Sequence, residues 1–234
     1  MPGKLGRGSW RWPSASLLGS LSDVSLQRLL GPGVTRQYMA GDVIIREGDV
    51  GTYVVALLDG VVKATGLTLD GKEALLAIRV GGDIVGEFAA LDERPRSSTV
   101  TTCGTVVGRI VGQTDFLAAL RQDPALGQAV HRSTLAKLRA ANERRVEFAG
   151  YDAPTRVARV LREIAVRSGE RTGNRIEIRW PLTQAELASL ATVAEPTVQK
   201  ALRTMRQSGI IATGYRNLTI VDFVALDLMA GRLG

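Results

Sequence analysis

The sequence of 234 residues has very few of the side chains that build metal centres and nucleophilic active sites. Its one cysteine, Cys103, excludes an internal disulfide and any four-cysteine zinc or iron–sulfur site. Its one histidine, His131, makes a multi-histidine metal site or a conventional catalytic triad hard to build. We therefore expect that the protein is not an enzyme, that Cys103 is a small core residue, and that His131 is solvated or lies at an interface.

Long hydrophobic runs are missing too. No stretch of about 18 consecutive apolar residues, the length that a membrane-spanning helix requires, occurs anywhere in the chain. The apolar patch around Leu17, Leu18 and Leu21 is interrupted by serine and glycine, unlike the hydrophobic region of a signal peptide. We therefore expect a cytoplasmic protein with no membrane partner.

Acidic residues are absent from residues 1–13, which carry three basic residues. Residues 14–151 are neutral overall, with 15 residues of each sign, whereas residues 152–234 carry 12 basic and 8 acidic residues. The net charge of +7 therefore resides in an N-terminal arm and in the C-terminal third of the chain. A polyanion is expected to bind there.

Glycine and proline divide the first half of the chain. Residues 1–14, rich in both, predict a flexible basic arm, and a capped helix is expected over Ser22–Leu30. Across residues 34–113, short apolar and β-branched runs alternate with glycine-containing turns, including the hairpin signal Asp70-Gly71. Strands at this spacing predict a compact β-barrel or jelly-roll, which we assign to residues 15–124.

After a short helix at Phe116–Leu120, residues 125–150 predict one long helix. Seam positions recur along this helix at a spacing near 3.5 residues, as in a coiled coil. A helix of this kind needs a partner, and a parallel homodimer supplies one, so residues 125–151 are assigned to dimerisation. The seam positions are Leu135, Leu138, Asn142, Arg145 and Ala149.

Residues 152–234 predict a smaller helical domain. Asp152 is placed to cap its first helix, and Pro154 is tolerated in the first turn of that helix. The chain as a whole is then an α+β protein, with an N-terminal β-roll, a long helix and a C-terminal winged helix-turn-helix. The expected elements of the last domain are a helix at 153–168, a turn at Gly169–Asn174, a strand at Arg175–Trp180, helices at 183–191 and 195–208, and a wing at Ile210–Val221.

The stretch from residue 182 to residue 211 has the layout of a helix-turn-helix. Thr183 and Glu186 form a capping box, and residues 191–193 make the turn. The first residues of a second helix reach base edges in the major groove, while hydroxyl and basic groups contact phosphates. An ordinary helical hairpin with a solvated basic face is the alternative. The residues expected to contact double-stranded DNA are Thr183, Glu195, Thr197, Gln199, Lys200 and Arg203.

The segment from Gly86-Glu87 to Arg96-Ser97 indicates a small phosphorylated ligand. Glu87 can accept a hydrogen bond from a ribose hydroxyl, and Arg96 can pair with a phosphate, with Ser97 and backbone N–H groups beside it. Gly86 lets the backbone approach the ligand closely. The alternative is an arginine in a β-turn paired with Glu87 or Glu93. The planar fork of arginine, accompanied by serine and glycine, favours the phosphate.

From about residue 17 to about residue 222, the chain resembles the cyclic-AMP receptor protein / Fnr family of bacterial transcription regulators. The strand–glycine layout of VIIREGDVGTYVVALLDG, the phosphate-binding cassette VGEFAALDERPRSSTV, the long helix and the Asp152 hinge follow in that family's order. Ala56, Ala90 and Ser98 are small departures from the family pattern. The resemblance implies a homodimer that binds double-stranded DNA and contacts RNA polymerase. It also implies cyclic AMP as the allosteric effector, with no cofactor required.

The resemblance implies a role for each residue of the ligand site. Ala141 has no polar group, so a second hypothesis gives the pocket a different effector or none. Asn142 suits either a purine contact or a polar seam residue that fixes the register of a dimer. The implied ribose-side contacts are Gly86 and Glu87, the cyclic-phosphate contacts are Arg96 and Ser97, and the purine-contacting positions are Ala141 and Asn142.

The recognition helix departs from the family pattern. Where family members carry Arg-Glu at the helix start and a second arginine four residues after that glutamate, this chain has Glu195, Pro196 and Lys200. The missing arginine is a guanine reader worth about 1–3 kcal/mol, so the usual family operator is not expected to be the best site. A third hypothesis is therefore a nucleotide sensor that acts mainly through protein contacts.

Overall fold

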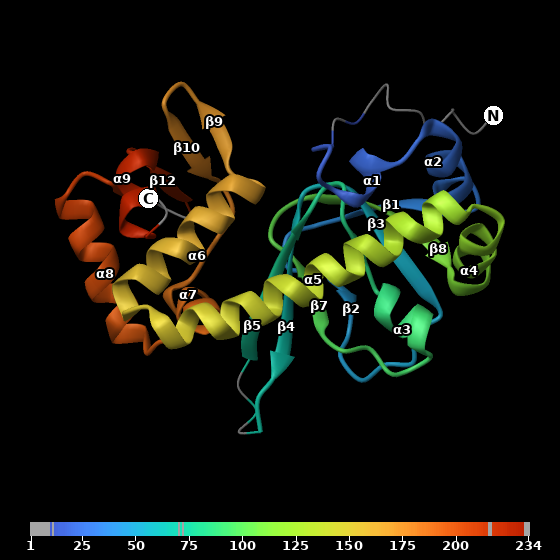
Figure 1. Cartoon of the computed structure of the whole chain (residues 1–234). Helices are drawn as coiled ribbons and strands as arrows, with labels where there is room; N and C mark the ends of the chain where they lie inside the picture. The colour runs from blue at the N-terminus through green and yellow to red at the C-terminus, as the bar shows by residue number, and fades with distance from the viewer. Residues whose placement is uncertain (1–9, 11, 70, 72, 215–216, 232–234) are drawn as a thin grey trace. The chain divides into compact units, whose positions relative to one another are not determined.

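The short β-branched runs of the N-terminal region pair into the two four-stranded sheets of a β-roll (Figure 1). The computed structural model describes residues 10, 12–69, 71, 73–214 and 217–231, without the side chains of residues 145 and 147–149. The strands are β1 (Val34–Tyr38), β2 (Val43–Ile45), β3 (Tyr53–Asp59), β4 (Val61–Leu67), β5 (Glu73–Val80), β6 (Ile84–Val85), β7 (Thr99–Thr102) and β8 (Val106–Gly112). The sheet orders are β1-β8-β3-β6 and β2-β7-β4-β5.

The described residues fall into two compact units, of which unit 1 takes residues 1–66 and 78–141 and unit 2 takes residues 67–77 and 142–234. The hairpin predicted at Asp70-Gly71 is confirmed to the extent that β4 and β5 are neighbours in one sheet. Gly71 has a φ of 76°, which glycine adopts without strain. Asp70 lies outside the described residues.

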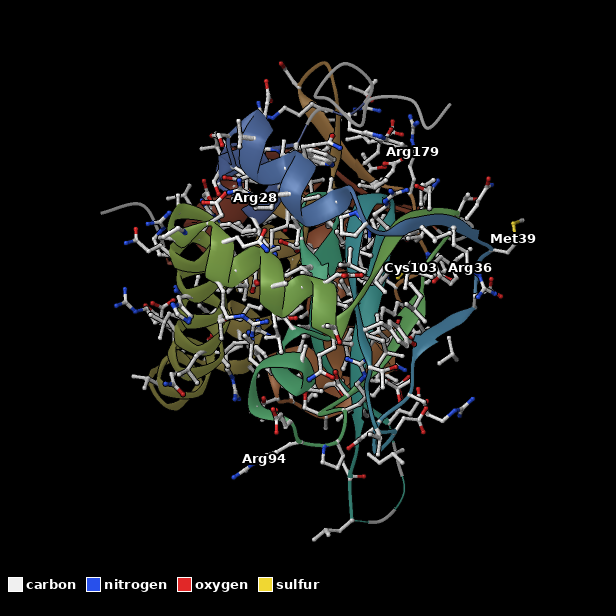
Figure 2. The ribbon with its side chains drawn as sticks, turned by 90° about the vertical axis from the view of Figure 1, so that its right-hand side faces the viewer. Arg28, Arg36, Met39, Arg94, Cys103 and Arg179 are labelled. Carbon is white, nitrogen blue, oxygen red and sulfur yellow. The ribbon has the colours of Figure 1, made fainter. Side chains whose placement is uncertain are left out.

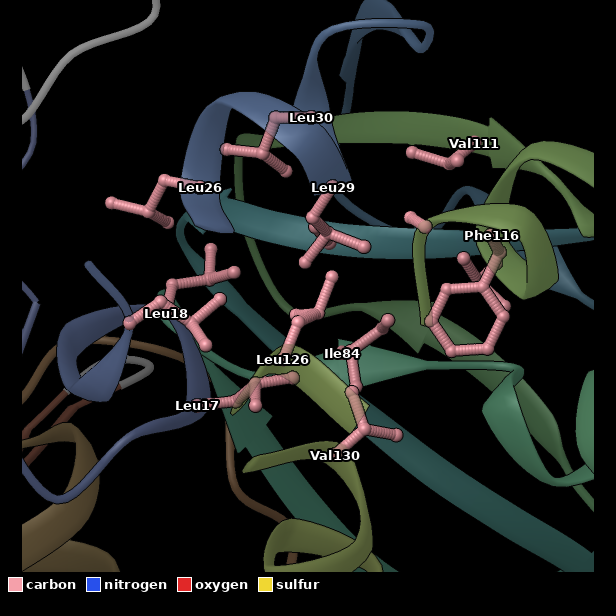
Figure 3. Close-up of a cluster of buried hydrophobic side chains, with 14 of the residues drawn as sticks. Leu17, Leu18, Leu26, Leu29, Leu30, Ile84, Val111, Phe116, Leu126 and Val130 are labelled. Carbon is pink, nitrogen blue, oxygen red and sulfur yellow. The ribbon is translucent and has the colours of Figure 1, made fainter. Parts of the chain in front are cut away.

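One hydrophobic core of unit 1 lies between helices and the first sheet, and a second is formed by strands of both sheets. The helices around it are α1 (Leu17–Ser20), α2 (Asp23–Leu30), α4 (Gln113–Gln122) and α5 (Pro124–Gly150). Figure 3 shows leucines of α1 and α2 packed with Ile84, Phe116 and the first turns of α5. The capped helix predicted over Ser22–Leu30 is confirmed, and Ser22 is its N-cap, because the Ser22 Oγ accepts from the Ser25 N–H. Helix α4 is longer than predicted, and Cys103 is buried within the β-roll (Figure 2), as expected.

The prediction of a flexible arm over residues 1–14 is wrong for residues 10 and 12–14, the part that the structure describes. Residues 1–9 and 11 lie outside the described residues. Trp10 and Trp12 pack against the core of unit 1. The indole Nε1 of Trp12 donates to the carbonyl of Leu58 over 2.8 Å. Two large indoles recover enough apolar burial to hold the segment despite its glycines and prolines.

The burial of apolar side chains on helix α5 decreases along its length. Leu126 and Val130 are fully buried in the core of unit 1, whereas Leu135 and Leu138 are 52% and 56% exposed. His131 is exposed on the same helix, as expected. The first turns of α5 are therefore fixed by the β-roll, and its predicted seam presents leucines to solvent in the single chain.

Unit 2 forms a small helical domain with a four-stranded sheet in the order β11-β12-β10-β9. Asp152 caps its first helix, as predicted, because its Oδ1 accepts from the Thr155 N–H over 3.0 Å. Two elements were not predicted: the turn at Gly169–Asn174 contains a strand, and a helix follows the wing. The elements are α6 (Ala153–Ser168), β9 (Glu170–Thr172), β10 (Arg175–Ile178), α7 (Gln184–Ala191), α8 (Glu195–Gln207), β11 (Ile211–Gly214), β12 (Asn217–Ile220) and α9 (Phe223–Met229).

Helix α9 is held to α6 by polar side chains. Its N-cap Asp222 accepts from the Ala225 N–H, and its Asp227 pairs with Arg162 of α6. Arg159 of α6 donates to the carbonyl of Ala230 over 2.8 Å. The chain after the wing is therefore part of the folded domain. Within the described part of the chain, no helix is long and apolar enough to span a membrane.

Candidate functional site

Four residues predicted to bind the ligand line one cavity of unit 1. Gly86 and Glu87 come from the end of β6 and the start of helix α3 (Glu87–Asp92), and Arg96 and Ser97 from the segment before β7. Helix α3 was not predicted. The remaining lining residues are Ile45, Ala64, Arg79, Ile84, Val85, Phe88, Ala89, Ser98, Val100 and Lys137.

Arg96 is buried and held by the protein backbone. Its Nη1 donates to the carbonyl of Gly86 over 2.8 Å, and its Nη2 donates to the carbonyl of Tyr53 over 2.6 Å. Its guanidinium carbon lies 4.8 Å from the centre of the Tyr53 ring, a cation–π contact. Burial lowers the pKa of Arg96, while the nearby Tyr53 hydroxyl and acidic groups oppose this shift. Within the described residues Arg96 forms no ion pair with Glu87 or Glu93, so the pairing named in the β-turn alternative is not seen.

Two glycines make room for this arginine. A Cβ on Gly51 would lie 2.2 Å from Cζ of Arg96, and a Cβ on Gly86 would lie 2.5 Å from its Nη1. Gly86 also has a φ of 85°, in the left-handed region. Both positions therefore require glycine if the Arg96 side chain is to keep its position in the lining of the cavity.

Glu87 forms a buried ion pair with Lys137 of α5. Its Oε1 lies 2.6 Å from Nζ of Lys137 on α5, and Nζ also donates to the carbonyl of Ile84 over 2.7 Å. The side chains of Glu87 and Lys137 are 5% and 11% exposed. Burial lowers the pKa of Lys137 and the neighbouring Arg79 adds to this effect, while Glu87 opposes it. This pair joins α5 directly to the candidate ligand site.

Lys137 was missed by the sequence analysis. It lies 50 residues from Glu87, and no local motif contains it. One signal was available: Lys137 stands four residues before Ala141, so both lie on the same face of the helix. Ala141 and Asn142 are exposed on α5 and are not among the residues that line the cavity.

The helix-turn-helix of unit 2 has the predicted local geometry. Thr183 accepts from the Glu186 N–H over 3.2 Å, and Glu186 accepts from the Thr183 N–H over 2.7 Å, which completes the capping box. Helix α8 buries Val198, Leu202 and Met205. Of the predicted DNA contacts, Thr183, Glu195, Gln199, Lys200 and Arg203 are exposed, and Thr197 is half-buried.

The turn between α7 and α8 contains a strained residue. Thr192 has a φ of 51°, which is unusual for a β-branched side chain, and it is exposed. Thr192→Gly is expected to raise the free energy of unfolding by about 1 kcal/mol, since only glycine adopts this region without a steric cost. Thermal unfolding of the full chain measures the change. Gln199→Gly, within α8, is the control and is expected to lower stability by about 1 kcal/mol. A loss of stability in Thr192→Gly would contradict the prediction.

Comparisons with known proteins match both units. A family model for the Cyclic nucleotide-binding domain matches residues 35–123, and one for the Crp-like helix-turn-helix domain matches residues 155–229. A CRP-like cAMP-activated global transcriptional regulator of Mycobacterium tuberculosis is 29% identical over 78% of this chain and 81% of its own length. The transcriptional activator protein FnrL of Cereibacter sphaeroides is 26% identical over 84% and 80%.

This chain belongs to the Crp/Fnr family of transcription regulators. A solved structure of a CRP-family transcriptional regulator from Thermus thermophilus shares its fold, with a TM-score of 0.71 at 22% identity over 84% of this chain and 96% of the other.

Membership of the Crp/Fnr family settles the class of protein. The chain is a DNA-binding transcription regulator with a cyclic nucleotide-binding domain, and its relatives are regulators rather than enzymes. Its α+β fold, with a β-rich N-terminal domain, a long helix and a C-terminal helix-turn-helix, is confirmed. Within the described residues, no group of three or more histidine, cysteine or acidic residues could hold a metal ion.

Proposed function

We propose that this Crp/Fnr regulator is a homodimer whose binding to DNA is controlled by a cyclic nucleotide in the cavity of unit 1. The observation that carries the proposal is the meeting of Gly86, Glu87, Arg96 and Ser97 around one cavity. A cyclic phosphate would bind at Arg96 and Ser97, and the ribose at Glu87. Cyclic AMP is the first effector to test, because the Mycobacterium tuberculosis relative is named as cAMP-activated.

The ion pair between Glu87 and Lys137 gives the effector a way to act on α5. A ribose hydroxyl that hydrogen-bonds to Glu87 competes with Lys137 for the same carboxylate, which in the structure described accepts from Nζ over 2.6 Å. Effector binding therefore changes the contact that ties α5 to the β-roll. Two arrangements of α5 are assumed to interconvert, and one of them is the DNA-binding state. A ligand that binds this state more tightly than the other increases its population, to an extent set by the difference between the two affinities.

The proposed dimer uses the exposed seam of α5. Leu135 and Leu138 are more than half exposed in the single chain, at a spacing typical of a coiled coil. Ligand binding is assigned to residues 15–124, dimerisation to residues 125–151 and DNA binding to residues 152–234. Two copies related by a twofold axis would present two α8 helices to one palindromic site in the cytoplasm, where RNA polymerase would be a further partner.

Two measurements on the full chain test this proposal together. Isothermal titration calorimetry with cyclic AMP and cyclic GMP measures effector binding, and selection from random double-stranded DNA, with and without nucleotide, identifies the operator. We expect binding in the micromolar range and enrichment of a palindrome that depends on the nucleotide. A palindrome enriched without any nucleotide would favour a different effector or none. Nucleotide binding without an enriched sequence would favour a sensor that acts through protein contacts.

The exposed basic residues of α8 are expected to contact phosphates. Lys200 and Arg203 form no ion pair within the part of the chain that the structure describes. Lys200→Gln or Arg203→Gln is expected to weaken binding to the selected operator and to reduce the slope of log K against log salt by about 0.9 for each lost phosphate contact. Fluorescence anisotropy at several salt concentrations measures the slope.

Arg179 offers a matched control for the salt dependence. It is an exposed arginine of the same unit (labelled in Figure 2), and it already pairs with Glu170 and Glu177 over 2.8 and 2.9 Å. Arg179→Gln is expected to leave the salt slope unchanged. Equal reductions in all three variants would mean that the slope reports net charge rather than contacts from α8.

A further inference from the structure

Arg144, near the end of helix α5, joins two other elements of unit 2. Its Nη1 donates to the carbonyl of Leu76, on strand β5, over 2.9 Å. Its Nη2 lies 3.6 Å from Oε1 of Glu163, on helix α6. All three residues belong to unit 2, so both contacts lie within one compact part of the described chain. These two contacts of Arg144, to Leu76 and to Glu163, are called the Arg144 bridge below.

The chemistry of arginine suits this bridge. A guanidinium presents five N–H donors in one plane, so it can satisfy a carbonyl and a carboxylate at the same time. The Arg144 side chain is 18% exposed, and its Nε is buried without a hydrogen-bond partner among the described residues. A buried donor without a partner costs free energy. The bridged arrangement is therefore only moderately favourable, and a ligand with a modest difference in affinity can displace it.

The Arg144 bridge reinforces the junction between α5 and α6. Arg159 precedes Glu163 by four residues, so the two side chains share a face of α6. The guanidinium carbon of Arg159 lies 4.5 Å from the ring centre of Tyr151, the residue that follows α5. One face of α6 is thus held by Tyr151 and by Arg144. Arg144 in addition ties this face to strand β5.

The elements that meet at the Arg144 bridge also contribute to the cavity. Lys137, which lines the cavity, precedes Arg144 on α5 by seven residues, or about two helical turns. Arg79, which also lines it, lies on β5 three residues after Leu76. One helix and one strand therefore connect the cavity to the bridge by continuous backbone. The proposed competition for Glu87 acts on Lys137, and so on the helix that carries Arg144.

We propose that Arg144 is a positioning residue that holds α6, and through it α8, in an arrangement with low affinity for operator DNA. This inference rests on the proposed function, in which a ribose hydroxyl replaces Lys137 at Glu87. The pair of Lys137 with Glu87 and the Arg144 bridge occur in the same structure and hold the same helix. An effector that breaks the first contact therefore disfavours the arrangement that contains the second. Arg144 acts through α6, and it does not line the cavity.

The operator affinity of Arg144→Ala, with and without nucleotide, tests this role. Fluorescence anisotropy of the full chain on the selected operator measures it, with whichever of cyclic AMP and cyclic GMP binds. Without nucleotide, we expect Arg144→Ala to bind the operator about fivefold or more tightly than the unchanged protein, a factor typical of allosteric coupling. With saturating nucleotide the two proteins are expected to bind equally, because the effector has already displaced the bridged arrangement.

Calorimetric titration without DNA gives a second readout that a merely structural role would not move. Arg144→Ala is expected to bind the nucleotide more tightly, because a larger fraction of the protein already has the binding-competent arrangement. Glu163→Gln removes the ion pair and keeps the Leu76 contact. It is expected to shift both affinities in the same direction by a smaller factor, and it serves if the alanine variant folds poorly.

Arg132→Ala is the matched control. Arg132 is exposed on the same helix, so its loss removes the same charge and leaves the Arg144 bridge intact. Its affinities are expected to equal those of the unchanged protein. Equal shifts in Arg132→Ala, weaker operator binding by Arg144→Ala without nucleotide, or an unchanged nucleotide dependence in both bridge variants would overturn the inference and leave the proposed function in place. Operator binding by the unchanged protein that responds to neither nucleotide would overturn both.

Discussion

Arg96→Ala is expected to weaken binding of a cyclic nucleotide by about 100-fold or more. Each charge-assisted hydrogen bond contributes roughly 1.5–3 kcal/mol, and the guanidinium fork would make two to a phosphate. Calorimetric titration measures the loss against the unchanged protein. Since both purine nucleotides carry the same cyclic phosphate, cyclic AMP and cyclic GMP should weaken by the same factor.

Arg96 also has a structural role that must be separated from ligand binding. It donates to the carbonyls of Gly86 and Tyr53 and is 4% exposed. Its removal is expected to lower the free energy of unfolding by about 1–3 kcal/mol, the cost of leaving a buried polar group without its partner. Urea unfolding of the same samples reports this loss, and titrations are made at a temperature where the variant remains folded.

Ser97→Ala tests the phosphate contact at a residue without the structural role of Arg96. Ser97 lines the cavity and is exposed, so its hydroxyl can be removed without disturbing the backbone contacts of Arg96. It is expected to weaken the nucleotide by about fivefold, with stability unchanged. Unchanged affinity in Arg96→Ala would show that this arginine only supports the loop by stacking on Tyr53, and the phosphate would have to bind elsewhere.

The features that could be predicted from the sequence are those formed by residues close to one another in the sequence. The capping box of Thr183 and Glu186 spans four residues, and the Asp152 cap acts on the N–H of Thr155. Gly86, Glu87, Arg96 and Ser97, which line one cavity, come from one short segment of the sequence. Such patterns fix backbone conformation through contacts between near neighbours, and they need no knowledge of the tertiary fold.

The features that the sequence analysis missed depend on contacts between distant residues. Lys137 meets Glu87 across 50 residues, and Trp12 meets the Leu58 carbonyl across 46. The arm was predicted as flexible from its glycines and prolines, because composition alone does not show where an indole finds a partner. Gly51 lies outside the cassette, and its need to be glycine follows only from the position of Arg96.

The start of helix α9 carries a local signal in the sequence. Asp222 is an N-cap residue followed by an apolar run, which is the usual start of a helix. The pairing of Asp227 with Arg162, which fixes the helix on α6, lies 65 residues apart in the sequence and could not be read from it. The existence of α9 was therefore predictable, and its packing was not.

Lys137→Met is expected to lower the free energy of unfolding by about 3 kcal/mol. The variant leaves the carboxylate of Glu87, only 5% exposed, without its cation, and breaking one side of a buried pair typically costs about 3–5 kcal/mol. Urea unfolding of the full chain measures the difference.

The double variant Glu87→Gln with Lys137→Met separates the pair from the packing around it. It removes both charges from the buried site, so we expect it to recover most of the stability that Lys137→Met loses. The double-mutant cycle then gives a coupling energy between the two side chains that exceeds the value of about 1 kcal/mol for exposed pairs. A coupling energy below about 1 kcal/mol would contradict the proposed route from the cavity to α5. An ion pair that stabilises the fold so little could not move α5 when a ribose hydroxyl replaces Lys137 at Glu87.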